Sequence, residues 1–136
     1  MMSAAMMGAT AFQKGLGAIH ALSHPIGAIY HTHHGTTNAV VMQAVMRFNR
    51  SEIEDRFVAA ARYFGIEGGF DGFYDFVGGL VTHLNIPKNL TDLGLRDLGD
   101  AELDRIVAAA LTDPSAGGNP RELTAKNTRA LLEACF

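Results

Sequence analysis

The chain has 136 residues, 48% of them hydrophobic, which suits one domain with one continuous core. Only 18% are charged and the formal net charge is -3, a composition that argues against a nucleic-acid partner. The single cysteine, Cys135, cannot form an internal disulfide and favours a cytoplasmic location. The apolar start lacks a basic segment, and no apolar run reaches the ~18 residues of a membrane span, so we expect neither a signal peptide nor a membrane partner.

The first part of the sequence predicts two apolar helices joined by a bend. Alanine and methionine dominate residues 3–15, and Gly15-Leu16-Gly17 separates them from a second apolar run at residues 18–30. Pro25 lacks a backbone donor, so the second helix is expected to begin near Ser23 or to kink there. Because an apolar helix normally packs against other elements on each side, we expect the chain to begin in the middle of a fold.

The rest of the sequence predicts further helices and no strand. Apolar side chains recur at helical spacing in five segments, which are residues 36–48, 51–64, 71–84, 100–113 and the segment from 124 onward. The expected N-terminal caps are Ser51, which pairs with Glu54 in a capping box, and then Asp71, Asp100 and Thr124. No internal repeat or flexible linker divides the chain. We therefore predict an all-α helical bundle that forms a single domain over residues 1–136.

Histidine is concentrated in one stretch, since five of the six histidines lie between residues 20 and 34. His20 and His24 are four residues apart, so on an unbroken helix their imidazoles share one face and could address one metal ion or one substrate. His34 follows at a separation that lets a helix and its turn bring a third imidazole to the same cleft. The alternative is that the first pair is two satisfied, partly buried side chains, and that His31 and His33 belong to a solvated loop or an accidental surface site.

Two motifs point to a known family. The segment GAIHALSHPIGA at residues 17–28 is followed by the pairs His34-Gly35, Asn38-Ala39 and Phe48-Asn49. This order resembles the second signature of the iron-containing (group III) alcohol dehydrogenases, which reads G-x-x-H-x-x-x-H-x-x-G, a spacer, H-G, an Asn-Ala pair and a closing Phe-Asn. The segment GNPRELT at residues 118–124 is similar to the family's G-N-P-R-x-L-T phrase before its last helix. The resemblance covers nearly the whole chain, with His33 standing where the family commonly has proline.

The resemblance implies that the bundle is the C-terminal metal-binding domain of such an enzyme. It places metal ligands for Fe²⁺ or Zn²⁺ on His20 and His34, and it places His24 near the nicotinamide and the substrate. A divalent ion polarises the alcohol oxygen so that hydride can leave carbon, and His24 could relay the alcohol proton to solvent. Extra imidazoles at His31 and His33 could compete for the ion.

The resemblance also implies a partner for this domain. The family's N-terminal domain, which holds NAD(P) in a Gly-rich turn after a strand, has no counterpart in this sequence, and the other two family ligands would lie upstream of Met1. We therefore expect weak metal binding, NAD(P) only through the missing domain, and no turnover without a nucleotide-binding partner chain. Apolar surface left without its other half favours a homo-oligomer, with a dimer as the expected state.

Three functions are compatible with the sequence. The first is a fragment or subunit of a metal-dependent, NAD(P)-linked alcohol dehydrogenase that interconverts alcohols and aldehydes or ketones once a partner is supplied. The second is a non-catalytic helical module for assembly or metal binding. The third is maleylacetate reductase or another branch of the same superfamily. Aromatic side chains at helical spacing are more typical of a core than of a substrate pocket, so none of them is assigned to a site.

Overall fold

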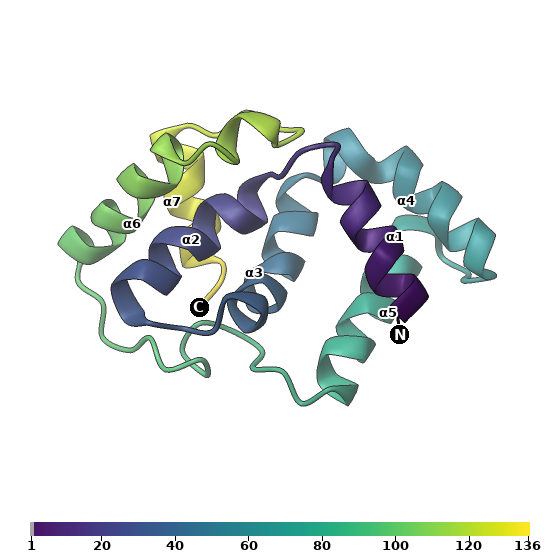
Figure 1. The fold of residues 1–136 in the computed structure, drawn as a ribbon, viewed down its shortest axis with the longest axis horizontal. Coiled ribbons are helices and arrows are strands. Elements are labelled where there is room, and N and C mark those ends of the chain that lie inside the picture. Colours follow the sequence, from purple (N-terminus) through teal and green to yellow (C-terminus); the bar gives the residue numbers. More distant parts are fainter. Residues whose placement is uncertain (1) are drawn as a thin grey trace.

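The computed structural model describes residues 2–136, and within that range it contains helices and no strand (Figure 1). The elements are α1 (Met2–Phe12), α2 (Ala18–Tyr30), α3 (His34–Phe48), α4 (Arg50–Phe64), α5 (Gly69–His83), α6 (Asp100–Thr112), the short 3₁₀ helix η1 (Ala116–Gly118) and α7 (Ala125–Glu133). The predicted all-α fold is confirmed. No helix in the described part of the chain is both long and apolar enough to cross a membrane.

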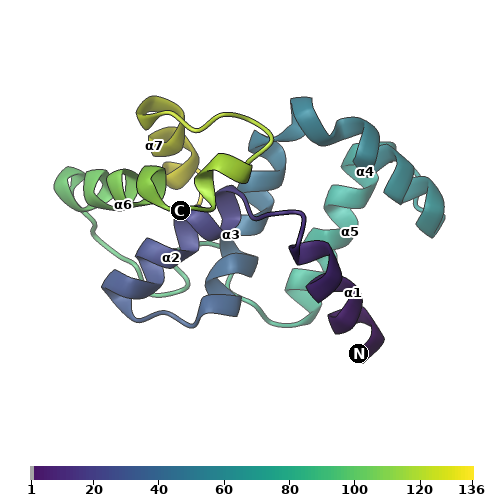
Figure 2. The same cartoon turned by 45° about the horizontal axis from the view of Figure 1, so that its top comes forward.

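Helix α2 lies at the centre of the main bundle, between α3 and α6, and α7 packs against α6 and also contacts α3 (Figures 1 and 2). The apolar face of α2 carries Leu22 and Ile26, both fully buried. The same core takes in Val41 from α3, Ile106 from α6 and Leu132 from α7. Burying a side chain of this size contributes roughly 1.5–3 kcal/mol, so this shared core holds α2 firmly between α3 and α6.

Helices α4 and α5 form a separate pair that extends away from this core (Figures 1 and 2). Aromatic contacts join them, with the ring of Phe57 5.1 Å from that of Phe70 and 5.2 Å from that of Phe73. At one end Arg50 bridges the two helices through Asp71, with an N–O distance of 2.8 Å. Few side chains of the pair are buried, and Phe64 lies exposed on its outer face.

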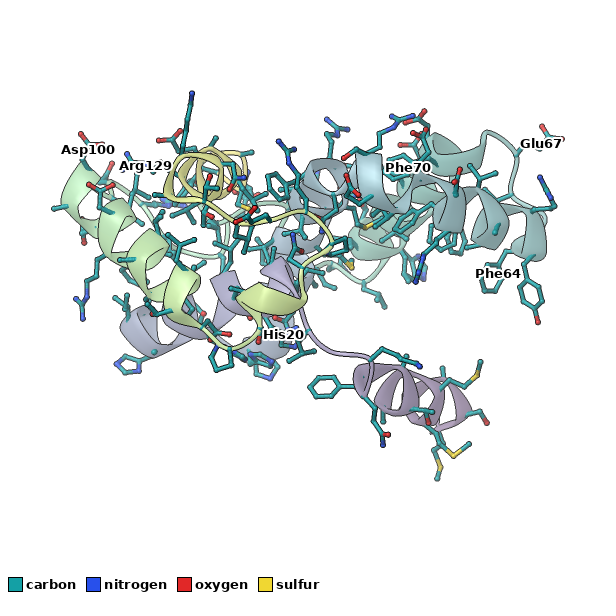
Figure 3. All side chains as sticks on the ribbon, turned by 90° about the horizontal axis from the view of Figure 1, so that it is seen from above. His20, Phe64, Glu67, Phe70, Asp100 and Arg129 are labelled. Carbon is teal, nitrogen blue, oxygen red and sulfur yellow. The ribbon has the colours of Figure 1, made fainter. Side chains whose placement is uncertain are left out.

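Helix α1 stands apart from the bundle, as the view in Figure 3 shows. None of its described residues is buried, although Met2, Met6, Met7 and Phe12 are all large and apolar. One side-chain contact joins α1 to α2: the ring of Phe12 lies edge-on to that of His20, with centroids 5.9 Å apart. In this position α1 exposes apolar surface to water, which is energetically unfavourable.

Several predicted helix starts are wrong by a few residues. Helix α4 begins at Arg50, directly after Asn49, so Ser51 lies inside the first turn and its hydroxyl contacts Glu52 instead of a backbone amide. Helix α5 begins at Gly69, ahead of Asp71, after Gly68 at a φ of 88°. In both cases a residue just upstream turns the chain, which the local cap pattern does not reveal.

The starts of α6 and α7 follow the predictions more closely. Gly99 is the cap of α6, one residue before the predicted Asp100, and its amide donates to the Glu102 carboxylate at 3.0 Å. Thr124 caps α7 as predicted, since its hydroxyl accepts the Asn127 amide at 3.3 Å and the Asn127 side chain accepts the Thr124 amide at 2.7 Å. Two orphan donors are thereby satisfied reciprocally.

Pro25 lies inside a helix, so of the two predicted alternatives a helix start near Ser23 is wrong. Helix α2 runs from Ala18 to Tyr30 with Pro25 inside it. Its ring is buried against the core, and the two helices that flank α2 hold the backbone in place. Packing thus overrides the unfavourable local preference of proline. As a result His20 and His24 share one helix, one turn apart.

Candidate metal centre

Three imidazoles from two helices meet at one edge of the bundle, where Figure 3 labels His20. His20 and His24 come from α2, and their ring centroids are 5.5 Å apart. His34, the first residue of α3, lies 5.2 Å from His20 and 5.4 Å from His24, and it stacks nearly parallel to the His24 ring. The turn between the helices therefore brings the third predicted site histidine beside the first two.

The side chain of Asn38 marks the point on which two of these rings converge. Its amide nitrogen lies 3.3 Å from Nε2 of His20 and 3.0 Å from Nε2 of His34. An amide N–H can only donate, so both Nε2 atoms accept and both direct a lone pair to the same place. The other end of the amide, Oδ1 of Asn38, is buried and has no hydrogen-bond partner among the described residues.

This donor set fits part of a divalent metal site. Neutral imidazole nitrogen is a preferred ligand of Zn²⁺ and Fe²⁺. Two nitrogen lone pairs that converge on one point are the arrangement that such an ion needs. Within residues 2–136, however, no group of three or more His, Cys, Asp and Glu side chains is arranged to hold an ion. His20 and His34 therefore offer two ligands, about half of a tetrahedral set.

The surroundings of His20 favour its neutral form. Burial is the largest influence and lowers the pKa of His20 below its usual value. Positive charge on His34 or His24 lowers it further, while the Asp113 carboxylate acts in the opposite direction. A neutral ring keeps the Nε2 lone pair available for an ion.

Asp113 is a site residue that sequence reasoning missed. Its Oδ2 lies 2.8 Å from Nδ1 of His24, although the two residues are 89 positions apart. Burial on its own raises the pKa of Asp113, but hydrogen bonds from Ser115 and His24 outweigh it, and the net effect is a lowered pKa. Asp113 follows the last turn of α6, so only the packing of α6 on α2 places it beside the imidazole.

His31 and His33 shape the turn between α2 and α3 and contact none of the three clustered rings. His31 ends α2 in the left-handed conformation, at a φ of 55°. His33 is the N-terminal cap of α3, with Nδ1 accepting the Thr36 amide at 3.3 Å. Its φ of -68° is one that proline adopts, which explains how histidine replaces the proline common in the family. Both side chains are exposed, as expected for a solvated loop, but His33 has a capping role that was not predicted from the sequence.

The second sequence motif anchors the start of α2. The Ala18 amide donates to Oδ1 of Asn119 at 3.1 Å. A Cβ added to Gly17 would lie 2.9 Å from that oxygen, and one added to Gly118 would clash with the Leu16 carbonyl oxygen. Both glycines are thus needed for the close approach of two backbone segments, and this approach fixes the helix turn that carries His20.

Comparison with known proteins defines the family. The model described as Fe-containing alcohol dehydrogenase family, C-terminal, matches residues 1–136, and the chain belongs to this family. It is 41% identical to 4-hydroxybutyrate dehydrogenase of Cupriavidus necator, a match that covers 98% of the chain and 36% of that protein. It is 34% identical to lactaldehyde reductase of Escherichia coli (strain K12), covering 90% of the chain and 33% of that protein.

Solved structures show the same fold. An iron-containing alcohol dehydrogenase from Thermococcus thioreducens superposes with a TM-score of 0.78 at 26% identity, over 89% of this chain and 32% of that one. A maleylacetate reductase from Rhizobium sp. strain MTP-10005 gives a TM-score of 0.66 at 27% identity, over 90% of this chain and 32% of that one. The chain spans about a third of the length of the relatives it matches.

Proposed function

We propose that this chain is a helical metal-binding part of an NAD(P)-linked alcohol dehydrogenase, which interconverts small alcohols with aldehydes or ketones. The observation that carries the proposal is the convergence of Nε2 of His20 and Nε2 of His34 on one point. Family membership supports the reaction class. Turnover requires the rest of such an enzyme, which supplies NAD(P) and the remaining metal ligands.

In this proposal the chain's own residues have separate tasks. His20 and His34 hold the ion through Nε2, and Fe²⁺ or Zn²⁺ supplies polarisation of the alcohol oxygen when bound. His24 accepts the proton of the alcohol hydroxyl and passes it to solvent, which its partly exposed ring can reach. The opposite flank of α2 is closed to water, since Ala21 and Leu22 on the same helix are fully buried.

We further propose that the chain works in the cytoplasm as a homo-oligomer, with a dimer as the simplest form. Exposed apolar side chains support association, among them Phe12 on α1, Phe64 on α4 and Leu84 at the end of α5. Multi-angle light scattering at micromolar concentration should give twice the chain mass. A stable monomer under the same conditions would contradict this part of the proposal.

The test of the site is metal titration of tag-free chain by calorimetry, with Zn²⁺ and Fe²⁺ as probes and plasma mass spectrometry as a check on stoichiometry. His20→Ala and His34→Ala should each weaken binding at least about tenfold, because each removes one of two nitrogen donors. His83→Ala is the matched control, since His83 lies exposed at the end of α5. Equal affinities in all four proteins would overturn the metal site.

Complementation tests the activity. The chain is mixed with the nucleotide-binding half of a relative, and NAD(P)H oxidation is followed with short aldehydes as substrates. We expect turnover that neither half shows alone and that His20→Ala and His34→Ala abolish. Metal binding without any turnover would favour the alternative of a non-catalytic module, and turnover with maleylacetate in preference to aldehydes would favour the maleylacetate reductase branch.

A further inference from the structure

The contact between His24 and Asp113 differs from the other acidic contacts of this protein. Arg129 also binds carboxylates, those of Asp100 and Asp104, but these side chains are 91% and 71% exposed. The Asp113 side chain is only 12% exposed, and its partner is a ring in the histidine cluster. A shielded carboxylate at 2.8 Å from a ring nitrogen is a strong, charge-assisted interaction.

The direction in which Asp113 points is fixed by a second bond. Its Oδ1 accepts the Ser115 amide at 2.8 Å, which leaves Oδ2 to face Nδ1 of His24. An ionised carboxylate only accepts hydrogen bonds, so the ring nitrogen that faces it must donate. In a neutral His24 ring the proton therefore lies on Nδ1, and the lone pair lies on Nε2.

We propose that Asp113 is a positioning residue that holds His24 in the Nδ1–H tautomer, with Nε2 free to accept a proton from an alcohol hydroxyl. This inference rests on the proposed relay through His24. The hydroxyl proton moves to Nε2, the ring becomes an imidazolium with both nitrogens protonated, and Nε2 then releases that proton to solvent. Asp113 stays ionised throughout and stabilises the transient positive charge, as buried carboxylates do beside catalytic histidines.

A purely structural role for the pair makes a different prediction. If the contact only fastened α6 to α2, a hydrogen bond of either polarity would suffice. Asp113→Asn separates the two roles, because the Ser115 amide claims the single side-chain oxygen and leaves the NH₂ group to face His24. The bond then survives with reversed polarity, and the ring proton must move from Nδ1 to Nε2.

The experiment is two-bond ¹H–¹⁵N correlation NMR of the histidine rings, recorded above the pH at which they titrate, with His24→Gln to assign His24. We expect Nδ1–H in the parent, Nε2–H in Asp113→Asn, and Nδ1–H again in Asp113→Glu. The ring signals of His31 and His83 serve as a control for correct folding. An Nε2–H tautomer in the parent overturns the inference without any variant, and an unchanged tautomer in a folded Asp113→Asn protein does the same.

Complementation with a nucleotide-binding half gives the second readout. Asp113→Asn should lower kcat about a hundredfold with KM little changed, since general acid–base catalysis typically contributes 10²–10⁴-fold. Equal kcat values in parent and variant overturn the positioning role. Turnover that survives His24→Gln overturns the proton relay itself, whereas a His24 tautomer that ignores Asp113 overturns only the role given to Asp113, so the two failures are distinguishable.

Discussion

Asn49 and Asn119 bind each other through both ends of their side-chain amides. Asn49 Nδ2 donates to Asn119 Oδ1 at 2.9 Å, and Asn119 Nδ2 donates to Asn49 Oδ1 at 2.8 Å. Both residues are buried, and Asn119 also accepts the Ala18 amide and donates to the Arg121 carbonyl oxygen. The pair therefore joins the end of α3 to the start of α2 and to the turn after η1, so it links the two sequence motifs, at residues 17–49 and 118–124.

Replacing Asn119 by alanine should destabilise the protein strongly. The Ala18 amide and both polar ends of Asn49 lose their partner in a buried place, and each unsatisfied group costs about 1–3 kcal/mol. We expect the free energy of unfolding in urea to fall by about 3 kcal/mol or more. Asn89→Ala is the control, because its side chain accepts a single exposed bond from Asp92, and it should lose under about 1 kcal/mol. Similar losses in both variants would contradict the buried network.

Asn38 offers a gain of metal affinity. Its amide occupies the point on which Nε2 of His20 and Nε2 of His34 converge, so Asn38→Asp places a carboxylate ligand there. Zn²⁺ affinity should rise at least about tenfold, equivalent to about 1.4 kcal/mol, in calorimetric titrations at pH 7.5. Asn38→Leu has similar size and no donor atom, so it should show no such gain. If the Asp and Leu variants bind Zn²⁺ equally, the two rings do not converge on a metal position.

Acid should weaken the contribution of Asp113 to stability. Its folded-state pKa lies below the ordinary value of 3.8, so its contribution is complete above that value and is lost as the pH falls through the lower, folded pKa. At pH 7 Asp113→Ala should cost about 2–3 kcal/mol, because a charged acceptor of two hydrogen bonds is removed. Urea unfolding from pH 7 to pH 2.5 should show this difference shrinking below about pH 4. A difference that stays constant across the range would mean that the carboxylate charge is irrelevant.

The helical pattern of this chain is legible in its sequence because apolar spacing and local caps are short-range signals. Thr124 caps α7 as predicted, through bonds with Asn127 only three positions away. Ser51 fails as a cap because Asn49, fixed by the buried Asn119, turns the chain two residues earlier. Local patterns therefore locate helices, and long-range contacts decide where several of them begin.

In the candidate site, too, local patterns predict some features and long-range packing decides others. The grouping of His20, His24 and His34 follows from helical spacing and a short turn, both of which can be read from nearby residues. The local preference of Pro25 is against an unbroken helix that would carry both His20 and His24. Packing in the bundle, where Pro25 is buried, keeps the helix continuous. Asp113 carries no local signal, since an aspartate before a proline is an ordinary helix end. The role of Asp113 depends on how α6 packs against α2, and residue spacing alone does not predict that packing.

Cys135 should resist thiol reagents in the folded protein. Its side chain is buried and its Sγ donates to the Leu131 carbonyl oxygen, and burial raises the pKa of the thiol to about 12. The thiolate is the reactive form, so the folded thiol at pH 8 should react with a disulfide reagent at least about a hundredfold more slowly than in 6 M guanidinium chloride. The control is Ser51→Cys in a Cys135→Ala background, because Ser51 is exposed and a cysteine there should react at once. Fast labelling of Cys135 without denaturant would show that the end of α7 opens readily, since the reagent can reach the sulfur only when that turn leaves the core.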